Sequence, residues 1–203
     1  MNGTARRGLR VGLLGGSFNP AHRGHLNIST MALNRLGLDR VWWLVSPQNP
    51  LKPAAYMAPF PARVAAAQAL ARDPRIAVST IEADLGTSFT ADTLSALHQR
   101  FGDTRFVWLM GADNLLQIPR WQRWREIFET TPVAVFARPS YSFQAAASRA
   151  ASAYAAARQP ADAAQGLTDC DPPAWVFLWT AFDTSSATAL RHESGPAPAG
   201  RNV

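Results

Sequence analysis

The sequence predicts an α/β fold, specifically a single-domain, Rossmann-like, doubly wound parallel sheet with helices on both faces. Three observations predict it. Six short apolar runs recur along the 203 residues, segments of helical length separate them, and no internal repeat breaks the alternation. Continuous apolar runs are typical of strands that are buried on both faces. Strands that alternate with helices favour a parallel sheet with right-handed crossovers.

The expected strands are short and end at residues that interrupt strands. The first, over residues 9–14, ends at Gly15 and Gly16. The second, over residues 40–45, ends at Ser46 and Pro47. The others are expected over residues 75–79, 105–110, 133–137 and 175–179.

The expected helices lie over residues 24–36, 60–71, 90–101, 121–128 and 142–158. Thr90 has a side chain suited to an N-cap, so we expect it to begin its helix in that role. Trp121, Trp124 and Phe128 are spaced by three and four residues, which places them on one helical face. Residues 159–173 read as a loop, because Pro and Asp fill four of the last five positions.

The composition is that of a globular protein with a basic charge balance. Hydrophobic residues make up 47% and Gly plus Pro only 28 of 203 residues, which excludes a disordered, collagen-like or coiled-coil chain. Twenty Lys and Arg face fourteen Asp and Glu, a net charge of +6, and Lys52 is the single lysine. A basic protein attracts anionic partners such as nucleotides or nucleic acid.

The sequence carries few signs of an oxidising or membrane environment. Cys170 is the single cysteine, so no disulfide forms within the chain. No apolar stretch is long enough to span a membrane, and the basic start lacks a signal-peptide core. We therefore expect a cytoplasmic protein without a membrane partner. Its domain is expected over residues 9–192, with flexible termini over residues 1–8 and 193–203.

The segment between the first expected strand and helix is the most informative. Residues 15–26 read GGSFNPAHRGHL, without the G-x-G-x-x-G or Walker pattern. His22 and His25 stand three residues apart around Gly24, at a helix start whose free N–H groups suit phosphate. A metal site is the weaker alternative, because H-E-x-x-H is absent and Cys170 is a poor third ligand. A purely structural role is the expectation for the lone His98 and His192.

These residues resemble the signature G-G-[ST]-F-[DN]-P-x-H-x-G-H of the HxGH nucleotidyltransferase superfamily. Members of that superfamily transfer a nucleotidyl group from a nucleoside triphosphate. Further segments are similar to one branch, the bacterial nicotinate-nucleotide adenylyltransferases. They are WLVSPQNPLK over residues 43–52, TADTL over 90–94, GADNL over 111–115 with the two tryptophans that follow, RPSY over 138–141 and TSSATALR over 184–191. The chain departs from this pattern at Asn19, Ser140 and Ala187, and Ala187 removes one hydroxyl from the expected phosphate loop.

The resemblance implies a site and a reaction. ATP and nicotinate mononucleotide give nicotinate adenine dinucleotide and pyrophosphate by direct attack, with Mg²⁺ bound mainly through ATP phosphates and without a protein metal site. The implied catalytic residues are His22, His25 and Arg191. The implied ATP-binding residues are Gly15, Gly16, Ser17, Phe18, His22, Gly24, His25, Gly111, Asp113, Ser186, Thr188 and Arg191. The implied mononucleotide-binding residues are Asn19, Asn49, Lys52, Phe89, Thr90 and Trp121.

Several of these residues have a plainer interpretation. Asp113 either accepts from ribose hydroxyls or is an acid that a helix N-terminus stabilises. Trp121 either stacks on the pyridine ring or belongs to the core, and Thr90 either caps a helix or helps to present N–H groups to the nicotinate carboxylate. Arg191 either grips the triphosphate or lies on the surface, and Lys52 either contacts a phosphate or is solvated.

Other functions remain open at this stage. Within the superfamily the alternatives are nicotinamide mononucleotide or another phosphorylated substrate such as phosphopantetheine. Outside it, the charge allows a nucleic-acid-binding module, although the arginines are dispersed and no recognition motif is present. A non-catalytic nucleotide sensor is disfavoured by the retention of both histidines. The sequence leaves the oligomeric state open.

Overall fold

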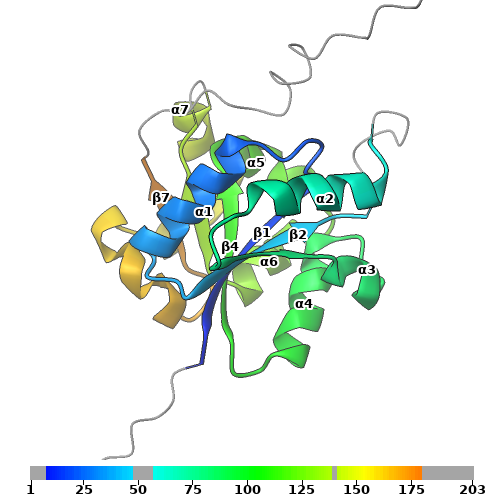
Figure 1. Cartoon of the computed structure of the whole chain (residues 1–203). Helices are drawn as coiled ribbons and strands as arrows, with labels where there is room; N and C mark the ends of the chain where they lie inside the picture. The colour runs from blue at the N-terminus through cyan, green and yellow to red at the C-terminus, as the bar shows by residue number, and fades with distance from the viewer. Residues whose placement is uncertain (1–7, 48–56, 139–140, 180–203) are drawn as a thin grey trace, which may run out of the picture.

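The computed structural model describes residues 8–47, 57–138 and 141–179, and these form one seven-stranded sheet with helices packed on it (Figure 1). Every strand pair is parallel, and the strand order is β3-β2-β1-β4-β5-β7-β6. The strands are β1 Arg10–Gly16, β2 Arg40–Val45, β3 Ile76–Ser79, β4 Arg105–Gly111, β5 Val133–Phe136, β6 Arg158–Gln159 and β7 Trp175–Leu178.

The strand order changes direction beside β1. The chain first builds outward from β1 through β2 to β3, and then returns to place β4 on the other side of β1. Leu14 of β1 pairs in register with Leu109 of β4, so the two strands end at the same edge of the sheet. In open α/β sheets ligands bind at this kind of switch point, beyond the carboxyl ends of the strands.

The helices connect the strands as the alternation predicts. The α-helices are α1 Arg23–Arg35, α2 Phe60–Leu70, α3 Ile81–Leu85, α4 Thr90–Arg100, α5 Ala112–Gln117, α6 Trp124–Thr130, α7 Ser142–Ala146 and α8 Arg149–Ala153. Short 3₁₀ segments follow at η2 Ile118–Arg120, η3 Ala155–Ala157 and η4 Ala161–Asp169. Within the described residues no helix is long and apolar enough to cross a membrane.

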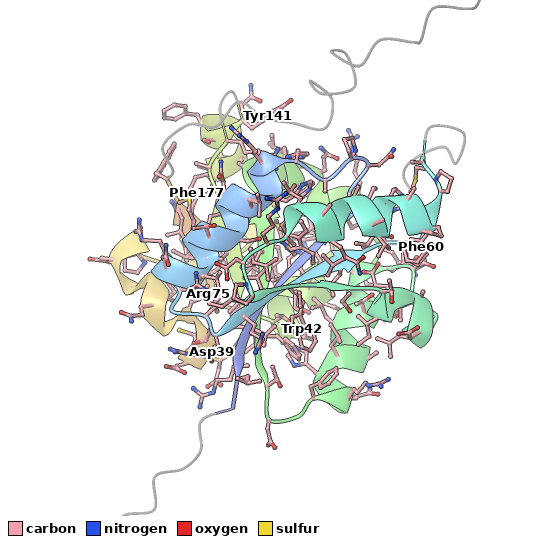
Figure 2. The ribbon with its side chains drawn as sticks, in the orientation of Figure 1. Asp39, Trp42, Phe60, Arg75, Tyr141 and Phe177 are labelled. Carbon is pink, nitrogen blue, oxygen red and sulfur yellow. The ribbon has the colours of Figure 1, made fainter. Side chains whose placement is uncertain are left out.

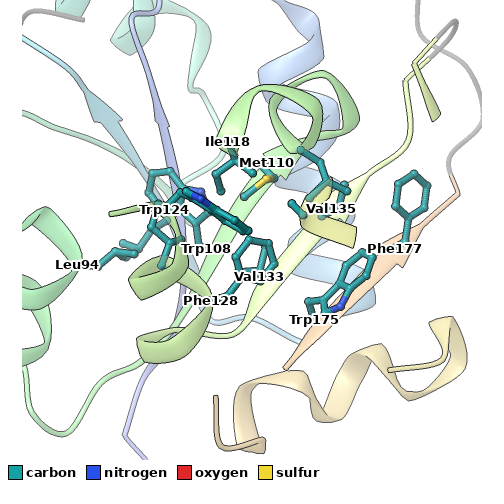
Figure 3. Packing of buried hydrophobic residues seen from close by; sticks show 14 of the residues in the cluster. Leu94, Trp108, Met110, Ile118, Trp124, Phe128, Val133, Val135, Trp175 and Phe177 are labelled. Atoms are coloured by element: carbon teal, nitrogen blue, oxygen red, sulfur yellow. The ribbon is translucent and has the colours of Figure 1, made fainter. Parts of the chain in front are cut away.

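Two hydrophobic cores cover the two faces of the sheet. Val107 and Leu109 of β4 pack with α1, α2 and η4 on one face. Phe106, Trp108 and Met110 of the same strand pack with α4, α5, α6, α7 and α8 on the other face, where Trp108 and Met110 meet Trp124 and Phe128 (Figure 3). Side chains fill both layers (Figure 2). Successive residues of a strand point to opposite faces, so one apolar run supplies both cores.

The expected fold class and all six expected strands are confirmed, while one helix prediction was wrong. Residues 142–158 do not form a single helix. Ser148 instead caps a second short helix, because its hydroxyl accepts a hydrogen bond from the Ala151 N–H at 3.3 Å. The segment ends in η3 and the short strand β6. The expected loop over residues 159–173 is wrong in part, since it contains the 3₁₀ segment η4.

Smaller corrections concern helix starts. α6 begins at Trp124, so Trp121 lies before the helix and Trp124 in its first turn. Thr90 is the first residue of α4 rather than its N-cap; Phe89 holds that position, and its side chain makes no capping hydrogen bond. The helix α3 was not foreseen, and α5 was expected only as the helix N-terminus in the plainer interpretation of Asp113. The expected flexible termini lie outside the described residues, apart from Gly8.

Candidate active site

His22 and His25 stand at the N-terminus of α1, directly beyond the loop that follows β1. His22 is the N-cap of α1, and its Nδ1 accepts a hydrogen bond from the Gly24 N–H at 3.1 Å. The His25 Nδ1 in turn accepts from the His22 N–H at 3.1 Å. The two histidines therefore make a reciprocal capping box in which imidazole nitrogens take the places usually held by Ser or Thr and Glu.

The capping box fixes how the two imidazoles present their protons. A ring nitrogen that accepts from a backbone N–H carries no hydrogen of its own. In the neutral rings the hydrogen of both histidines is therefore on Nε2, which makes Nε2–H the donor that each ring offers to another group. The ring centroids lie 3.8 Å apart, so the two donors are held close together. A close pair of N–H donors at a helix N-terminus suits phosphate oxygens.

Aromatic side chains hold the His25 ring in place. Phe18 lies 4.5 Å from the His25 ring and 5.2 Å from the Trp43 ring, between centroids. Phe18 is only 2% exposed and has a positive φ of 46°, an unusual backbone conformation for a large residue. The packing of Phe18 against His25 and Trp43 therefore holds the loop in one conformation.

Two glycines at the strand ends allow close packing. A Cβ on Gly15 would lie 2.3 Å from the Trp108 ring, so this glycine makes room for a core side chain as well as lying in the loop motif. A Cβ on Gly111 would lie 2.4 Å from the Asp113 Oδ1 and 2.8 Å from the Arg138 Nε. Gly111 thus makes room for the ion pair between Asp113 and Arg138, whose Nε and Oδ1 are 3.3 Å apart.

Four of the predicted mononucleotide-binding residues are among those that the structure describes. The Asn19 Oδ1 accepts from the Ala58 N–H at 3.2 Å, which ties the loop after β1 to the start of α2. Phe89 and Thr90 form the N-terminus of α4 and are half-buried. Trp121 is half-buried against the core, whereas Trp124 is buried within it, so of these two tryptophans Trp121 has the side chain that reaches the surface.

Part of the predicted site lies outside the described residues. This applies to Asn49, Lys52, Ser186, Thr188 and Arg191, and to the departures Ser140 and Ala187. Their roles stay predictions. His98, by contrast, is described and structural, because its Nε2 bonds the Thr131 Oγ1 at 2.9 Å and burial lowers its pKa.

Two buried charged residues near the site were missed by the sequence reasoning. Arg63 of α2 is 2% exposed and donates to the backbone carbonyls of Ser17 and Ser46. Glu82 of α3 is 7% exposed and hydrogen-bonded to Ser46 and Thr93, and burial raises its pKa to about 7. Both lie in segments without a recognisable chemical motif, so the sequence offered no signal for either.

Comparison with known proteins finds similar sequences over nearly the whole chain. The family model described as cytidylyltransferase-like matches residues 13–193. A "Probable nicotinate-nucleotide adenylyltransferase" of Parvibaculum lavamentivorans is 56% identical over 188 residues, covering 93% of this chain and 94% of that protein. One of the same name from Cereibacter sphaeroides is 56% identical over 181 residues, covering 89% and 96%.

Among solved structures, a Plasmodium falciparum nicotinic acid mononucleotide adenylyltransferase complexed with NaAD matches with a TM-score of 0.65. The match covers 89% of this chain and 82% of that one, at 13% sequence identity. At this identity the likeness concerns the fold, and it supports the doubly wound sheet described above.

Proposed function

The chain belongs to the cytidylyltransferase-like family, and we propose that within it the chain acts as a nicotinate-nucleotide adenylyltransferase. The reaction transfers AMP from ATP to nicotinate mononucleotide and releases pyrophosphate. The observation that carries this proposal is the paired imidazoles of His22 and His25 at the start of α1, at the switch point between β1 and β4. Relatives that share more than half of their residues over nearly the whole chain carry this name.

The proposed chemistry is a direct displacement at phosphorus. An oxygen of the mononucleotide phosphate attacks the α-phosphorus of ATP, the bond from that phosphorus to the bridging oxygen breaks, and pyrophosphate leaves with the electron pair. The attacking phosphate is already ionised near neutral pH, so no general base and no covalent enzyme intermediate are needed. Catalysis then consists of holding two phosphates in line and stabilising the charge that develops between them.

The described residues supply parts of this task. The Nε2–H donors of His22 and His25 bind ATP phosphate oxygens and stabilise the developing charge on the leaving group. The loop from Gly15 to Phe18 and the turn at Gly111 form the ATP side, where the carboxylate of Asp113, oriented by Arg138, accepts from ribose hydroxyls. Arg191, Ser186 and Thr188 complete the triphosphate site in this proposal.

The mononucleotide is proposed to bind from the side of α4. The N-terminus of α4 offers backbone N–H groups and the positive end of its dipole at Thr90, which suits the nicotinate carboxylate. Trp121 is proposed to stack on the pyridine ring. Asn19, Asn49, Lys52 and Phe89 are the further contacts that we propose.

Mg²⁺ is the proposed cofactor, bound mainly through ATP phosphates. Within the part of the chain that the structure describes, no group of three or more His, Cys, Asp or Glu side chains gathers as a metal site. With nucleotides, Mg²⁺ favours coordination by phosphate oxygens and waters. Bound there, the ion neutralises negative charge on the phosphates.

The substitution His25→Ala tests the function and the assigned role together. With ATP, Mg²⁺ and nicotinate mononucleotide, wild-type protein is expected to release pyrophosphate, and H25A to lose at least about tenfold in kcat, roughly 1.4 kcal/mol of barrier. H98Q is the matched control, because His98 is structural and Gln keeps a partner for Thr131. Activity of H25A close to that of H98Q would contradict the role of His25.

The acid–amide preference tests the choice of substrate. The carboxylate of nicotinate mononucleotide is expected to bind the N–H donors at the α4 N-terminus more strongly than the neutral amide of nicotinamide mononucleotide does. We therefore expect the higher kcat/KM for the acid, measured with both substrates under the same ATP concentration. An equal or higher kcat/KM for the amide would contradict the preference for the acid and favour nicotinamide mononucleotide as the substrate.

A further inference from the structure

Arg63 is a buried cation whose partners are backbone carbonyls. Its Nη1 donates to the Ser17 oxygen at 2.6 Å and to the Ser46 oxygen at 2.8 Å. Its Nη2 donates to the Pro47 oxygen at 2.8 Å, and its Nε to the Ala58 oxygen at 3.0 Å. The side chain is 2% exposed, and among the described residues no carboxylate forms an ion pair with it.

The four carbonyls belong to the segments that surround the proposed site. Ser17 lies in the loop after β1 that leads to the histidine pair, and Ser46 and Pro47 follow β2. Ala58 precedes α2, whose first turn carries Phe60 (Figure 2), and the Arg63 guanidinium lies 5.3 Å from the centre of that ring. One planar group therefore joins the loop after β1, the loop after β2 and the residues before α2.

Neighbouring contacts reinforce the same junction. The Ser46 N–H donates to the Gly16 oxygen at 3.0 Å, and the Ala58 N–H donates to the Asn19 side chain at 3.2 Å. Phe18 directly follows Ser17 and keeps its positive φ of 46° in this loop. A strained residue persists only where its surroundings fix it. Arg63 helps to hold Phe18 in this conformation, because it binds the Ser17 carbonyl of the peptide that joins Ser17 to Phe18.

Arg63 acts through its charge as well as through the hydrogen bonds that hold the loops together. A buried charge without a carboxylate partner is costly, and carbonyl dipoles offset the cost only in part. Its field favours anions brought to the same edge of the sheet. The Ser17 carbonyl also shares its peptide with the Phe18 N–H, and a hydrogen bond from a cation at one end of a peptide strengthens the donor at the other end.

We propose that Arg63 is a positioning residue, whose guanidinium sets the distance between the loop after β1 and the loop after β2. The loop after β1 leads to the histidine pair that is proposed to bind ATP, and the loop after β2 leads to the proposed mononucleotide contacts. Arg63 therefore controls how well the α-phosphorus and the attacking phosphate are aligned. The inference rests on the proposed function, and it adds a residue that touches neither substrate.

The test compares Arg63→Met, Arg63→Lys and the control Arg72→Met. R63M keeps an apolar stem of similar length and removes every donor. R63K keeps the charge but places its donors on one atom, which cannot satisfy carbonyls spread over three segments. Arg72 lies just after α2, is exposed, and contacts the Ala69 oxygen at 3.4 Å, so R72M removes an arginine without touching the junction.

The measurements are kcat and KM for each substrate, with the folded fraction determined by circular dichroism and thermal unfolding. We expect R63M to lose at least about thirtyfold and R63K at least about tenfold in kcat per folded molecule, and R72M to stay within about twofold, because misalignment raises the barrier itself. A purely structural role would lower the folded fraction and leave kcat per folded molecule unchanged.

The outcomes separate this inference from the proposed function. If wild-type protein makes no nicotinate adenine dinucleotide, the proposed function fails. If the wild type is active and folded R63M falls short of a tenfold loss in kcat, the positioning role is overturned. Should R63M not fold, R63K decides by the same tenfold criterion.

Discussion

Glu82 is a carboxyl group that three elements enclose. It lies on α3, is hydrogen-bonded to Ser46 after β2, and has the Thr93 hydroxyl of α4 at 3.5 Å. Thr93 also contacts the Thr87 hydroxyl at 2.9 Å. Burial raises the pKa of Glu82 from 4.5 to about 7, and the hydrogen bonds from Ser46 and Thr93 oppose this only in part. The neutral acid is therefore populated at this position near neutral pH.

The raised pKa of Glu82 predicts a pH dependence of stability. The folded protein holds this proton more tightly than the unfolded chain, so stability falls as pH rises from about 4.5 to about 7 and is level above that. Glu82→Gln removes the titration. We expect the unfolding free energy of wild type, relative to E82Q, to fall by roughly 2 to 3 kcal/mol between about pH 5 and about pH 8.

Urea denaturation of both proteins across this range measures the difference. Asp84→Asn is the control, because Asp84 is an exposed carboxylate on the same helix. A wild-type minus E82Q difference that stays constant with pH would contradict the assignment of the proton to Glu82.

Among individual residues, the sequence predicted those in motifs and missed the buried charged residues Arg63 and Glu82 near them. His22, His25 and Asp113 were predicted as site residues because they stand in segments with a recognisable pattern. Arg63 stands in an alanine-rich helix, where an arginine is usually solvated. Its burial depends on carbonyls of the loops after β1 and β2. No local sequence pattern predicts that these loops lie beside Arg63.

The helix α1 is held to the sheet by a buried polar contact as well as by its apolar face. The Ser29 hydroxyl donates to the His25 oxygen at 2.8 Å and accepts from the Trp43 Nε1 at 2.7 Å. Ser29 and Trp43 are both fully buried. This contact fixes α1 against β2 one turn beyond the histidine pair, so it links the orientation of His25 to the strand beneath it.

Replacing Ser29 by Ala tests this link. The change leaves the Trp43 N–H buried without its acceptor, which costs about 1–3 kcal/mol of unfolding free energy. We expect S29A to lose that amount in urea denaturation and to show a lower kcat than wild type. Thr30→Ala, an exposed change on the same helix, should alter neither quantity appreciably. Equal stability of the two variants would contradict the role of Ser29.

The element predictions succeeded where burial is continuous and failed where short helices meet. The strands were predicted correctly because strands such as β4 and β5 carry apolar side chains on both faces of the sheet. The break within residues 142–158 was missed because alanine favours helix throughout, and the Ser148 cap decides the break. The helices α3 and α5 are too short to show a period.

At the scale of the whole molecule, five of the described arginines are paired with carboxylates. Among the described arginines, ion pairs with carboxylates form at Arg10, Arg75, Arg105, Arg123 and Arg138. Arg123 alone contacts both Asp92 and Glu126. Each pair offsets the charge of its arginine, so these five arginines add little to a basic surface of the kind that binds a long polyanion.

Binding of the proposed product should stabilise the whole sheet. A ligand that touches the loops after both β1 and β4 binds the folded state alone, and at about one hundred times its dissociation constant it adds about 2.7 kcal/mol. For a chain of this size that corresponds to a rise of roughly 5–10 °C in Tm. Thermal unfolding with nicotinate adenine dinucleotide measures the shift. An unchanged Tm in wild type at such a concentration would contradict the site.

The pairing of β1 with β4 also sets the order in which the molecule can be assembled. The two strands are neighbours in the sheet, yet residues 10–16 and 105–111 are separated by the whole first half of the structure. During synthesis one edge of β1 stays unpaired until β4 has left the ribosome. Contacts of such long range close slowly, and unpaired strand edges invite aggregation. The proposed catalytic centre is therefore completed only after β4 has been made, and until then the open edge of β1 is exposed to aggregation.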